Sequence, residues 1–185
     1  MEADWEIEIG GDAPVIDACW PGFVDLRSAP EKAFQLMEVI EFPALASALA
    51  AFNSHDSLFT VKCDVWPVNT IDPLELDAPT ESAVHALACY IDLLRRDAQL
   101  WTDPRVAIGW CKRVCAALQA FSLGCSRVDL VTRSAIGAEG QDTVGVTSYV
   151  AACGQTKEAA KAGLGLALKM LAECIQSAES GSTEP

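Results

Sequence analysis

Between Leu58 and Val68 the chain alternates between apolar and polar side chains, and this pattern constrains the fold more than any other local feature. One face of the segment would carry Phe59, Val61, Cys63 and Val65, and the other would carry Thr60, Lys62, Asp64 and Trp66. Successive side chains of a strand point to opposite faces, so the alternation predicts a half-buried strand. Such a strand belongs in a sheet that packs on a core with one face and meets solvent with the other.

Five further segments have strand character. Extended runs at residues 5–9, 15–20 and 23–27 are separated by Gly and Pro, which predicts a small meander near the N-terminus or, over the last two runs, one long bent strand with a bulge. Residues 127–136 and 143–153 are joined by a turn rich in Gly, Glu, Gln and Asp, which predicts a hairpin.

Helical spacing of apolar residues recurs elsewhere. We expect helices at residues 28–37, 43–53, 80–100, 103–122 and 156–177. Asp103 followed by Pro104 is a typical helix start, with a capping carboxylate before Pro at the first helical position. The short connection at residues 100–103 then predicts that the helices on either side of it form an antiparallel pair.

These elements predict an α+β fold. The expected architecture is an antiparallel sheet of about five to six strands, a meander and a hairpin, packed mainly on one side by helices as a two-layer sandwich. At 185 residues a single core is the natural expectation, so we expect one domain over residues 1–178. The small, polar residues 179–185 predict a disordered C-terminal tail.

Charge and composition exclude some classes of partner. The formal net charge is −13, and such a surface repels phosphate backbones, so we expect no nucleic-acid partner. No run of about 20 apolar residues occurs, so we expect no membrane partner. The first residues are acidic and no apolar segment follows them, so we expect no secretory signal. We expect a cytoplasmic protein, whose eight cysteines would then be reduced.

Four cysteine and histidine side chains have the i,i+4 spacing of ligands on helices. His85 and Cys89 would lie on one helix of the predicted pair, level with Cys111 and Cys115 on the other. Three sulfurs and one nitrogen suit zinc, which makes zinc the alternative to a protein without a cofactor. No metal is the favoured interpretation, because free cysteines are commonly small buried apolar residues.

Catalytic candidates are few. Asp25, Asp64 or Asp129 could act as an acid or base, and Cys19 or Cys63 could act as a nucleophile. A nucleophilic cysteine needs a base nearby, and the chain has two histidines, His55 and His85. No recognised hydrolase, metalloprotease, nucleotide-binding or dinucleotide-binding motif occurs.

Polar and aromatic side chains line up on the predicted strands. They would share one open face of the sheet, since alternate residues of a strand point the same way. The expected binding surface consists of Asp25, Arg27, Lys62, Asp64, Trp66, Asp129, Arg133 and Tyr149. Trp66 and Tyr149 would supply flat packing platforms, and the charged residues would fix the orientation of a partner.

The sequence therefore favours a cytoplasmic, non-catalytic binding or regulatory protein. Its binding surface would be the polar, Trp-containing sheet face together with the acidic exterior. The partner would be a protein or a small molecule, and self-association into a homo-oligomer is left open. The alternative is a thiol- or metal-dependent enzyme, a zinc-based or cysteine-based hydrolase or transferase.

Overall fold

The computed structural model of the chain describes residues 1–11, 13–18, 21–54, 57–69, 72, 76, 78–79 and 83–180. In this part of the chain a six-stranded sheet has the order β1-β5-β6-β4-β3, and β2 also pairs with β5. The strands are β1 (Glu2–Glu8), β2 (Val15–Ile16), β3 (Leu58–Val68), β4 (His85–Arg95), β5 (Ser126–Ile136) and β6 (Asp142–Gly154). The helices are η1 (Pro30–Gln35), α1 (Met37–Glu41), α2 (Ala44–Ser54), η4 (Ala98–Trp101), α3 (Pro104–Gln119) and α4 (Lys157–Ser180), where η marks a 3₁₀ helix.

The sheet is mixed, so the expectation of a purely antiparallel sheet is wrong. Strands β3, β4, β6 and β5 pair in antiparallel fashion, but β1 and β2 both run parallel to β5. They occupy successive parts of the same edge, with Glu2 opposite Arg127 and Val15 opposite Ala135. The N-terminal meander is also wrong, because β1 and β2 pair with β5 instead of each other. Residues 23–27 form no strand.

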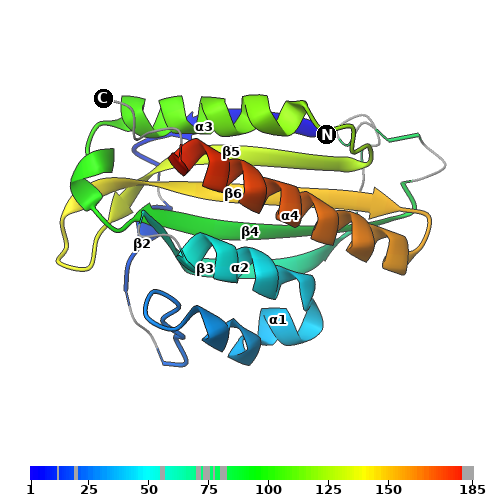
Figure 1. Ribbon diagram of the computed structural model, residues 1–185, viewed down its shortest axis with the longest axis horizontal. Coiled ribbons are helices and arrows are strands. Elements are labelled where there is room, and N and C mark those ends of the chain that lie inside the picture. The colour runs from blue at the N-terminus through cyan, green and yellow to red at the C-terminus, as the bar shows by residue number, and fades with distance from the viewer. Residues whose placement is uncertain are drawn as a thin grey trace.

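Helices α2, α3 and α4 lie across one face of the sheet (Figure 1). The main core lies between these helices and the sheet, and it includes Trp110 of α3, Leu168 of α4 and Leu49 of α2. Cys89, Ile91 and Leu93 of β4 enter the same core. We call the opposite side of the sheet the open face.

The predicted helix over residues 80–100 is a strand from His85 to Arg95. Val84, Leu87 and Ile91 have helical spacing, but the segment also alternates, with Cys89, Ile91 and Leu93 facing the helices. Short apolar runs fit both the helical period of 3.6 residues and the strand period of two. Here the segment is a strand because it pairs with β3 on one side and β6 on the other. The antiparallel helix pair expected before and after Trp101 is therefore absent from the described residues.

A bulge in β3 divides the strand into two parts. The register with β4 shifts between Thr60 and Lys62. Before the shift, Phe59 and Val61 pack with Val15 in a small cluster separate from the main core. After the shift, Cys63 and Val65 pack on the main core, so the four residues do not share one face as predicted. A bulge switches the side-chain alternation, and the sequence shows no sign of it.

Helix α4 extends through Ser180, past the boundary expected at residue 178. Arg95 donates to both carboxylate oxygens of Glu179 at 2.6 and 2.9 Å, and Trp110 donates to the same carboxylate at 2.7 Å. These contacts fix the end of the helix against β4 and α3. Residues 181–185 of the predicted tail lie outside the described residues.

Two glycines of α4 are used for packing inside the chain. A Cβ atom at Gly163 would lie 3.3 Å from Cβ of Ala152 on β6, and one at Gly165 would lie 3.0 Å from Cβ of Ala44 on α2. The helix thus approaches both the sheet and its neighbour closely, which offsets the helix propensity lost at glycine.

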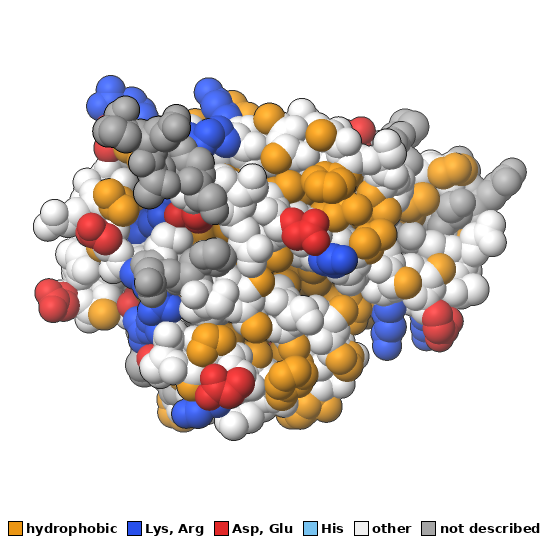
Figure 2. Space-filling model, in the orientation of Figure 1, with side chains coloured by type: hydrophobic (Ala, Val, Ile, Leu, Met, Phe, Trp, Pro, Cys, Tyr) orange, Lys and Arg blue, Asp and Glu red, His pale blue; other side chains and the backbone are white. Residues whose placement is uncertain are grey.

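Figure 2 shows the helix-covered side of the molecule, where apolar side chains gather over α1. The exposed large apolar residues of η1 and α1 are Phe34, Met37 and Ile40.

Among the described residues, no helix combines the length and apolar character needed to cross a bilayer.

Candidate functional site

Polar side chains of neighbouring strands meet on the open face in two cross-strand rows. Directly paired residues of a sheet point to the same side. The first row joins Lys62, Asp92 and Thr147 across β3, β4 and β6. The second row joins Asp64, Tyr90, Tyr149 and Asp129 across β3, β4, β6 and β5.

A cavity of about 550 Å³ lies over these rows. Its floor is formed by side chains from four strands, Lys62, Tyr90, Asp92, Arg133, Thr147 and Tyr149. Its wall is formed by Ala13, Pro14, Val15, Ile16 and Ala18. We call it the sheet-face cavity, and residues 13–18 the covering segment. One side is therefore polar and aromatic, and the other is mainly apolar.

Backbone pairing and one close approach position the covering segment. Its residues Val15 and Ile16 pair with Ala135 and Ile136 of β5 as strand β2, and the amide of Asp17 donates to the carbonyl oxygen of Ile136 at 2.9 Å. Val15 also lies directly over Gly145 of β6, where a Cβ atom would come within 3.0 Å of both Val15 and Leu94. The absence of a side chain at position 145 lets the segment close one end of the cavity.

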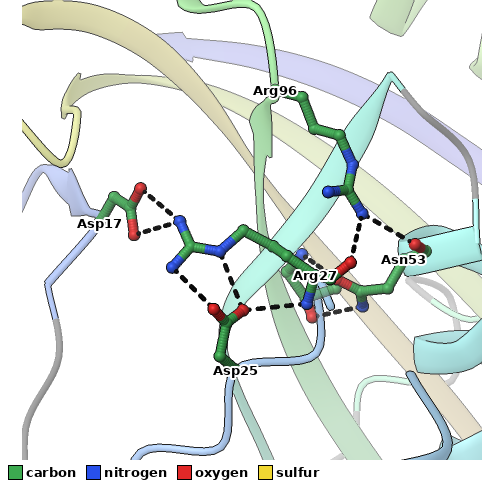
Figure 3. Close-up of polar contacts among 6 residues, drawn as sticks. Asp17, Asp25, Arg27, Asn53 and Arg96 are labelled. Atoms are coloured by element: carbon green, nitrogen blue, oxygen red, sulfur yellow. Dashed lines mark hydrogen bonds and ion pairs between the residues drawn. The ribbon is translucent and has the colours of Figure 1, made fainter. Parts of the chain in front are cut away.

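An arginine anchors the far end of the covering segment (Figure 3). Arg27 donates to both oxygens of Asp17, at 3.1 and 2.9 Å, and to both oxygens of Asp25, at 2.9 and 3.2 Å. Its guanidinium carbon also lies 4.9 Å from the ring centroid of Phe59 on β3. Bidentate carboxylate pairs of this kind are among the stronger hydrogen bonds in proteins.

The Arg27 loop is itself held to the helix-covered layer. Arg96 donates to the carbonyl oxygens of Arg27 and Asn53, at 3.1 and 2.9 Å (Figure 3). Asn53 in turn donates to the Thr60 hydroxyl at 2.8 Å and accepts from the Thr60 amide at 3.1 Å. A continuous chain of hydrogen bonds therefore runs from Asp17 to the end of α2.

Asp92 is the acidic side chain in the floor of the cavity. The Thr147 hydroxyl donates to Asp92 at 2.6 Å, and Asp92 forms no ion pair with any described residue. Burial raises the pKa of Asp92 above the usual range, against the opposing effects of the Thr147 bond, Arg133 and Lys62. A carboxylate that is partly desolvated and unpaired is typical of functional sites.

The two cationic side chains of the cavity, Arg133 and Lys62, make different contacts. Arg133 pairs with Glu8 of β1 at 2.6 Å, and its guanidinium carbon lies 5.8 Å from the Tyr149 ring centroid. Its Nε is buried without a hydrogen-bond partner among the described residues. The Lys62 ammonium lies 5.6 Å from the Tyr90 ring centroid, and its hydrogen bond to Tyr90 raises the pKa of Lys62.

The predicted binding surface is distributed over three places. Lys62, Arg133 and Tyr149 line the cavity. Asp64, Trp66 and Asp129 are on the same strands and outside the cavity lining; the Trp66 ring centroid lies 6.0 Å from that of Tyr90, and Asp129 pairs with Arg127 at 2.8 Å. Asp25 and Arg27 are not on a strand. They hold Asp17, so their contribution is to position the covering segment.

Besides Thr147, which the expected binding surface also omitted, sequence reasoning missed two residues of the cavity floor, Tyr90 and Asp92. Both fall in the segment predicted as a helix, so neither was placed on the open face. The signal that could have found them is the two-residue alternation after Cys89, which sends Tyr90 and Asp92 away from the core while Ile91 and Leu93 enter it. The local sequence does not indicate that the covering segment lies beside this cavity, because its position depends on pairing with β5, which is distant in sequence.

The four residues of the alternative zinc site do not converge in the described structure. His85 and Cys89 are on β4, whereas Cys111 and Cys115 are on α3. The Cys115 thiol donates to the carbonyl oxygen of Asp4 at 3.1 Å, and the Cys111 sulfur lies 3.6 Å from the Thr132 hydroxyl. No group of three or more potential metal-ligating side chains is found in the part of the chain that the structure describes. The i,i+4 spacing places two ligands on one face only in a helix, and the segment that contains His85 and Cys89 is a strand.

Five of the described thiols are disfavoured as nucleophiles by burial. Burial raises the pKa of Cys63, Cys89 and Cys115 to about 12 and that of Cys111 and Cys153 to about 11. The thiolate is the reactive form, so these shifts disfavour attack at neutral pH. Among the other catalytic candidates, Arg27 lowers the pKa of Asp25, which weakens it as a base. Cys19 and His55 lie outside the described residues.

Comparison of the chain with protein-family models, with curated proteins and with solved structures finds no match in any of the three. Function is therefore inferred from the side chains of the open face.

Proposed function

We propose that the protein is a non-catalytic binding protein that holds a small polar molecule in the sheet-face cavity. The observation that carries this proposal is the convergence of Lys62, Asp92 and Arg133 from three strands beneath one covering segment. Two tyrosines complete the floor, with ring centroids 6.2 Å apart. Ligand sites typically combine an apolar lining with a few charged groups that fix orientation.

The size and enclosure of the cavity favour a small molecule over a protein partner. Its volume of about 550 Å³ falls within the range of roughly 300–1,000 Å³ that is usual for ligand pockets. Residues 13–18 form a wall beside the polar floor, and a small molecule fits between the two more readily than a flat protein surface. Trp66, outside the cavity lining, would bound the site and would not contact the ligand directly.

Binding without catalysis is favoured by the chemistry of the candidate groups. The described thiols whose pKa values are raised are poor nucleophiles, and the four residues of the alternative zinc site are divided between β4 and α3. The proposal therefore needs no metal or other cofactor. The net charge of −13 supports the absence of a nucleic-acid partner.

A cytoplasmic location is part of the proposal. It is supported by seven described cysteines, none of which forms a disulfide. Oxidising compartments favour disulfides between cysteines, whereas reducing ones keep thiols free.

The test is a thermal-shift screen of the purified protein against a library of small polar metabolites, including amino acids, carboxylates and amines. A ligand at 100 times its Kd stabilises the native state by about 2.7 kcal/mol. For a chain of this length that corresponds to a rise in Tm of roughly 5–10 °C. We expect at least one compound to produce such a shift.

The matched variants separate cavity binding from surface binding. Lys62→Met with Arg133→Met should abolish the shift, whereas Arg105→Met with Lys169→Met, which removes the same charge at exposed positions, should preserve it. A library in which no compound shifts Tm contradicts the proposal. A shift that survives the first pair of substitutions contradicts it equally, provided that circular dichroism shows a folded protein.

A further inference from the structure

We propose that the ligand of the sheet-face cavity is a small zwitterion such as a free amino acid, with its ammonium group held by Asp92 and its carboxylate held by Arg133. The inference rests on the proposed function and assigns a chemical class to the ligand of that site.

Asp92 supplies the contact for a positive group. One carboxylate oxygen accepts from Thr147 at 2.6 Å, and no cationic side chain among the described residues lies within ion-pair distance. A carboxylate can accept about four hydrogen bonds, so most of its acceptor capacity is available to a ligand. Lys62, its direct cross-strand neighbour, instead has its ammonium over the Tyr90 ring. A ligand ammonium would supply the opposite charge that a partly buried carboxylate needs.

Arg133 supplies the contact for a negative group. Its pair with Glu8 uses Nη2, and its Nε is buried and has no partner in the described structure. A buried N–H without an acceptor costs about 1–3 kcal/mol. A ligand carboxylate could accept from the guanidinium N–H groups that Glu8 does not use, since arginine forms strong hydrogen bonds with carboxylates.

The positions of the two residues suit a ligand whose opposite charges are close together. Asp92 pairs with Thr147 on β6, and Arg133 pairs with Gly145 on the same strand. Their backbones are therefore separated by two strand spacings across the sheet and two residues along it, roughly 12 Å in all. The Arg133 side chain extends toward Tyr149, which brings its guanidinium to the same part of the floor as Asp92. Both side chains line one cavity of about 550 Å³, so a single small molecule that carries an ammonium and a carboxylate can contact the two.

The remainder of the cavity fits an apolar or aromatic side chain. Pro14, Val15 and Ile16 form one wall, and the rings of Tyr90 and Tyr149 form part of the floor. A simple carboxylate would place a second negative charge beside Asp92. A simple amine would offer no negative group to the guanidinium of Arg133. A zwitterion provides a positive group for Asp92 and a negative group for Arg133.

The experiment is isothermal titration calorimetry of the wild-type protein with the twenty free L-amino acids. The tightest binder is then compared with two analogues, one lacking the ammonium and one lacking the carboxylate. For L-phenylalanine these are 3-phenylpropanoate and 2-phenylethylamine. We expect at least one amino acid to bind, and each analogue to bind at least about tenfold more weakly, because each leaves one charged group unpaired.

Two substitutions assign the contacts. Asp92→Asn should weaken amino-acid binding at least about tenfold while leaving the carboxylate analogue no weaker. Arg133→Met should weaken amino-acid binding while leaving the amine analogue unchanged. Arg105→Met, far from the cavity lining, should change neither.

The outcomes distinguish this inference from the function on which it rests. If no amino acid binds but a carboxylate or an amine from the metabolite library does, the zwitterion is wrong and cavity binding stands. If an amino acid binds and its two analogues bind equally well, the assignment of the ligand as a zwitterion is also wrong. If no compound of any class binds, both proposals fail.

Discussion

The hydroxyl of Thr147 lies 2.6 Å from a carboxylate oxygen of Asp92, its direct neighbour across the pairing of β6 with β4. This bond fixes the carboxylate in the floor of the sheet-face cavity. It does not neutralise the charge, and burial still raises the pKa of Asp92. The carboxylate is therefore held in place without an ion-pair partner among the described residues.

Replacing Asp92 should stabilise the protein. Its pKa is higher in the native state than in the unfolded chain, because burial outweighs Thr147, Arg133 and Lys62. The native state therefore binds the proton more tightly, and its stability falls as pH rises through the interval between the two pKa values. Asp92→Asn removes this penalty, so its free energy of unfolding should exceed that of wild type at pH 7.

The pH dependence provides the check. Urea unfolding at several pH values should show that the advantage of Asp92→Asn disappears below about pH 3.9, the usual pKa of an unfolded aspartate. A variant less stable than wild type at pH 7 would show that the carboxylate contributes net stability and that its burial has been misjudged.

Arg27 should control the covering segment. In Arg27→Met, Asp17 and Asp25 lose the hydrogen bonds that the guanidinium donates, and the free energy of unfolding should fall by about 2 kcal/mol, the usual scale for hydrogen bonds to charged groups. Amide hydrogen exchange at residues 13–18 should accelerate more than exchange in β4 or β6, and ligand affinity should fall.

The control for this variant is Arg105→Met. Arg105 also pairs with a carboxylate, that of Asp103, but its side chain is 88% exposed. It should leave both stability and exchange at residues 13–18 unchanged. Equal exchange in the two variants would mean that Arg27 does not anchor the segment.

Gly145 should tolerate no side chain. A Cβ atom there would come within 3.0 Å of Val15 and Leu94, so Gly145→Ala should destabilise the protein by about 1–3 kcal/mol and displace the covering segment. Gly109, inside α3, is the matched control, because the nearest atom to its added Cβ is 3.8 Å away at the end of Arg113. Gly109→Ala should raise stability by roughly 1 kcal/mol through helix propensity. Chemical unfolding of both variants decides the point; a stable Gly145→Ala protein would contradict the close approach.

Glu179 should be a main anchor of the C-terminal helix. Its carboxylate accepts from Arg95 and Trp110, and its side chain is 10% exposed. Glu179→Ala leaves Arg95 buried without its partner and should cost about 3 kcal/mol of unfolding free energy. Glu173→Ala removes an exposed contact with Lys169 at 3.8 Å and should change stability by less than about 0.5 kcal/mol. Similar losses in the two variants would show that α4 ends before Glu179.

Local patterns predicted the elements whose own sequence determines them. The Asp103–Pro104 start was placed correctly, and the Asp103 carboxylate accepts from the amide of Arg105 as an N-cap should. The strand at Leu58–Val68 and the β5–β6 hairpin were also predicted. Partners distant in sequence were not, since nothing local in Glu2 or Ala3 specifies parallel pairing with Arg127 or Val128.

The same limit explains what was predicted of the site. Lys62, Arg133 and Tyr149 were placed on the open face because their strands alternate clearly. Asp92 was missed because helical spacing of the apolar residues around it competed with strand alternation. Arg27 was placed on a strand, although its position is set by contacts with Asp17 and Asp25 that only the folded chain brings together.

The most direct test of binding in the sheet-face cavity uses the two tyrosines of the chain, Tyr90 and Tyr149, both of which line it. Protein labelled with 3-fluorotyrosine should give two ¹⁹F NMR resonances, assigned through Tyr90→Phe and Tyr149→Phe. Titration with the tightest-binding amino acid should move both resonances to saturation, with the Kd measured by calorimetry. If both resonances stay unmoved when calorimetry shows the protein saturated, or when each of the twenty amino acids is added in excess, the sheet-face cavity is not an amino-acid site.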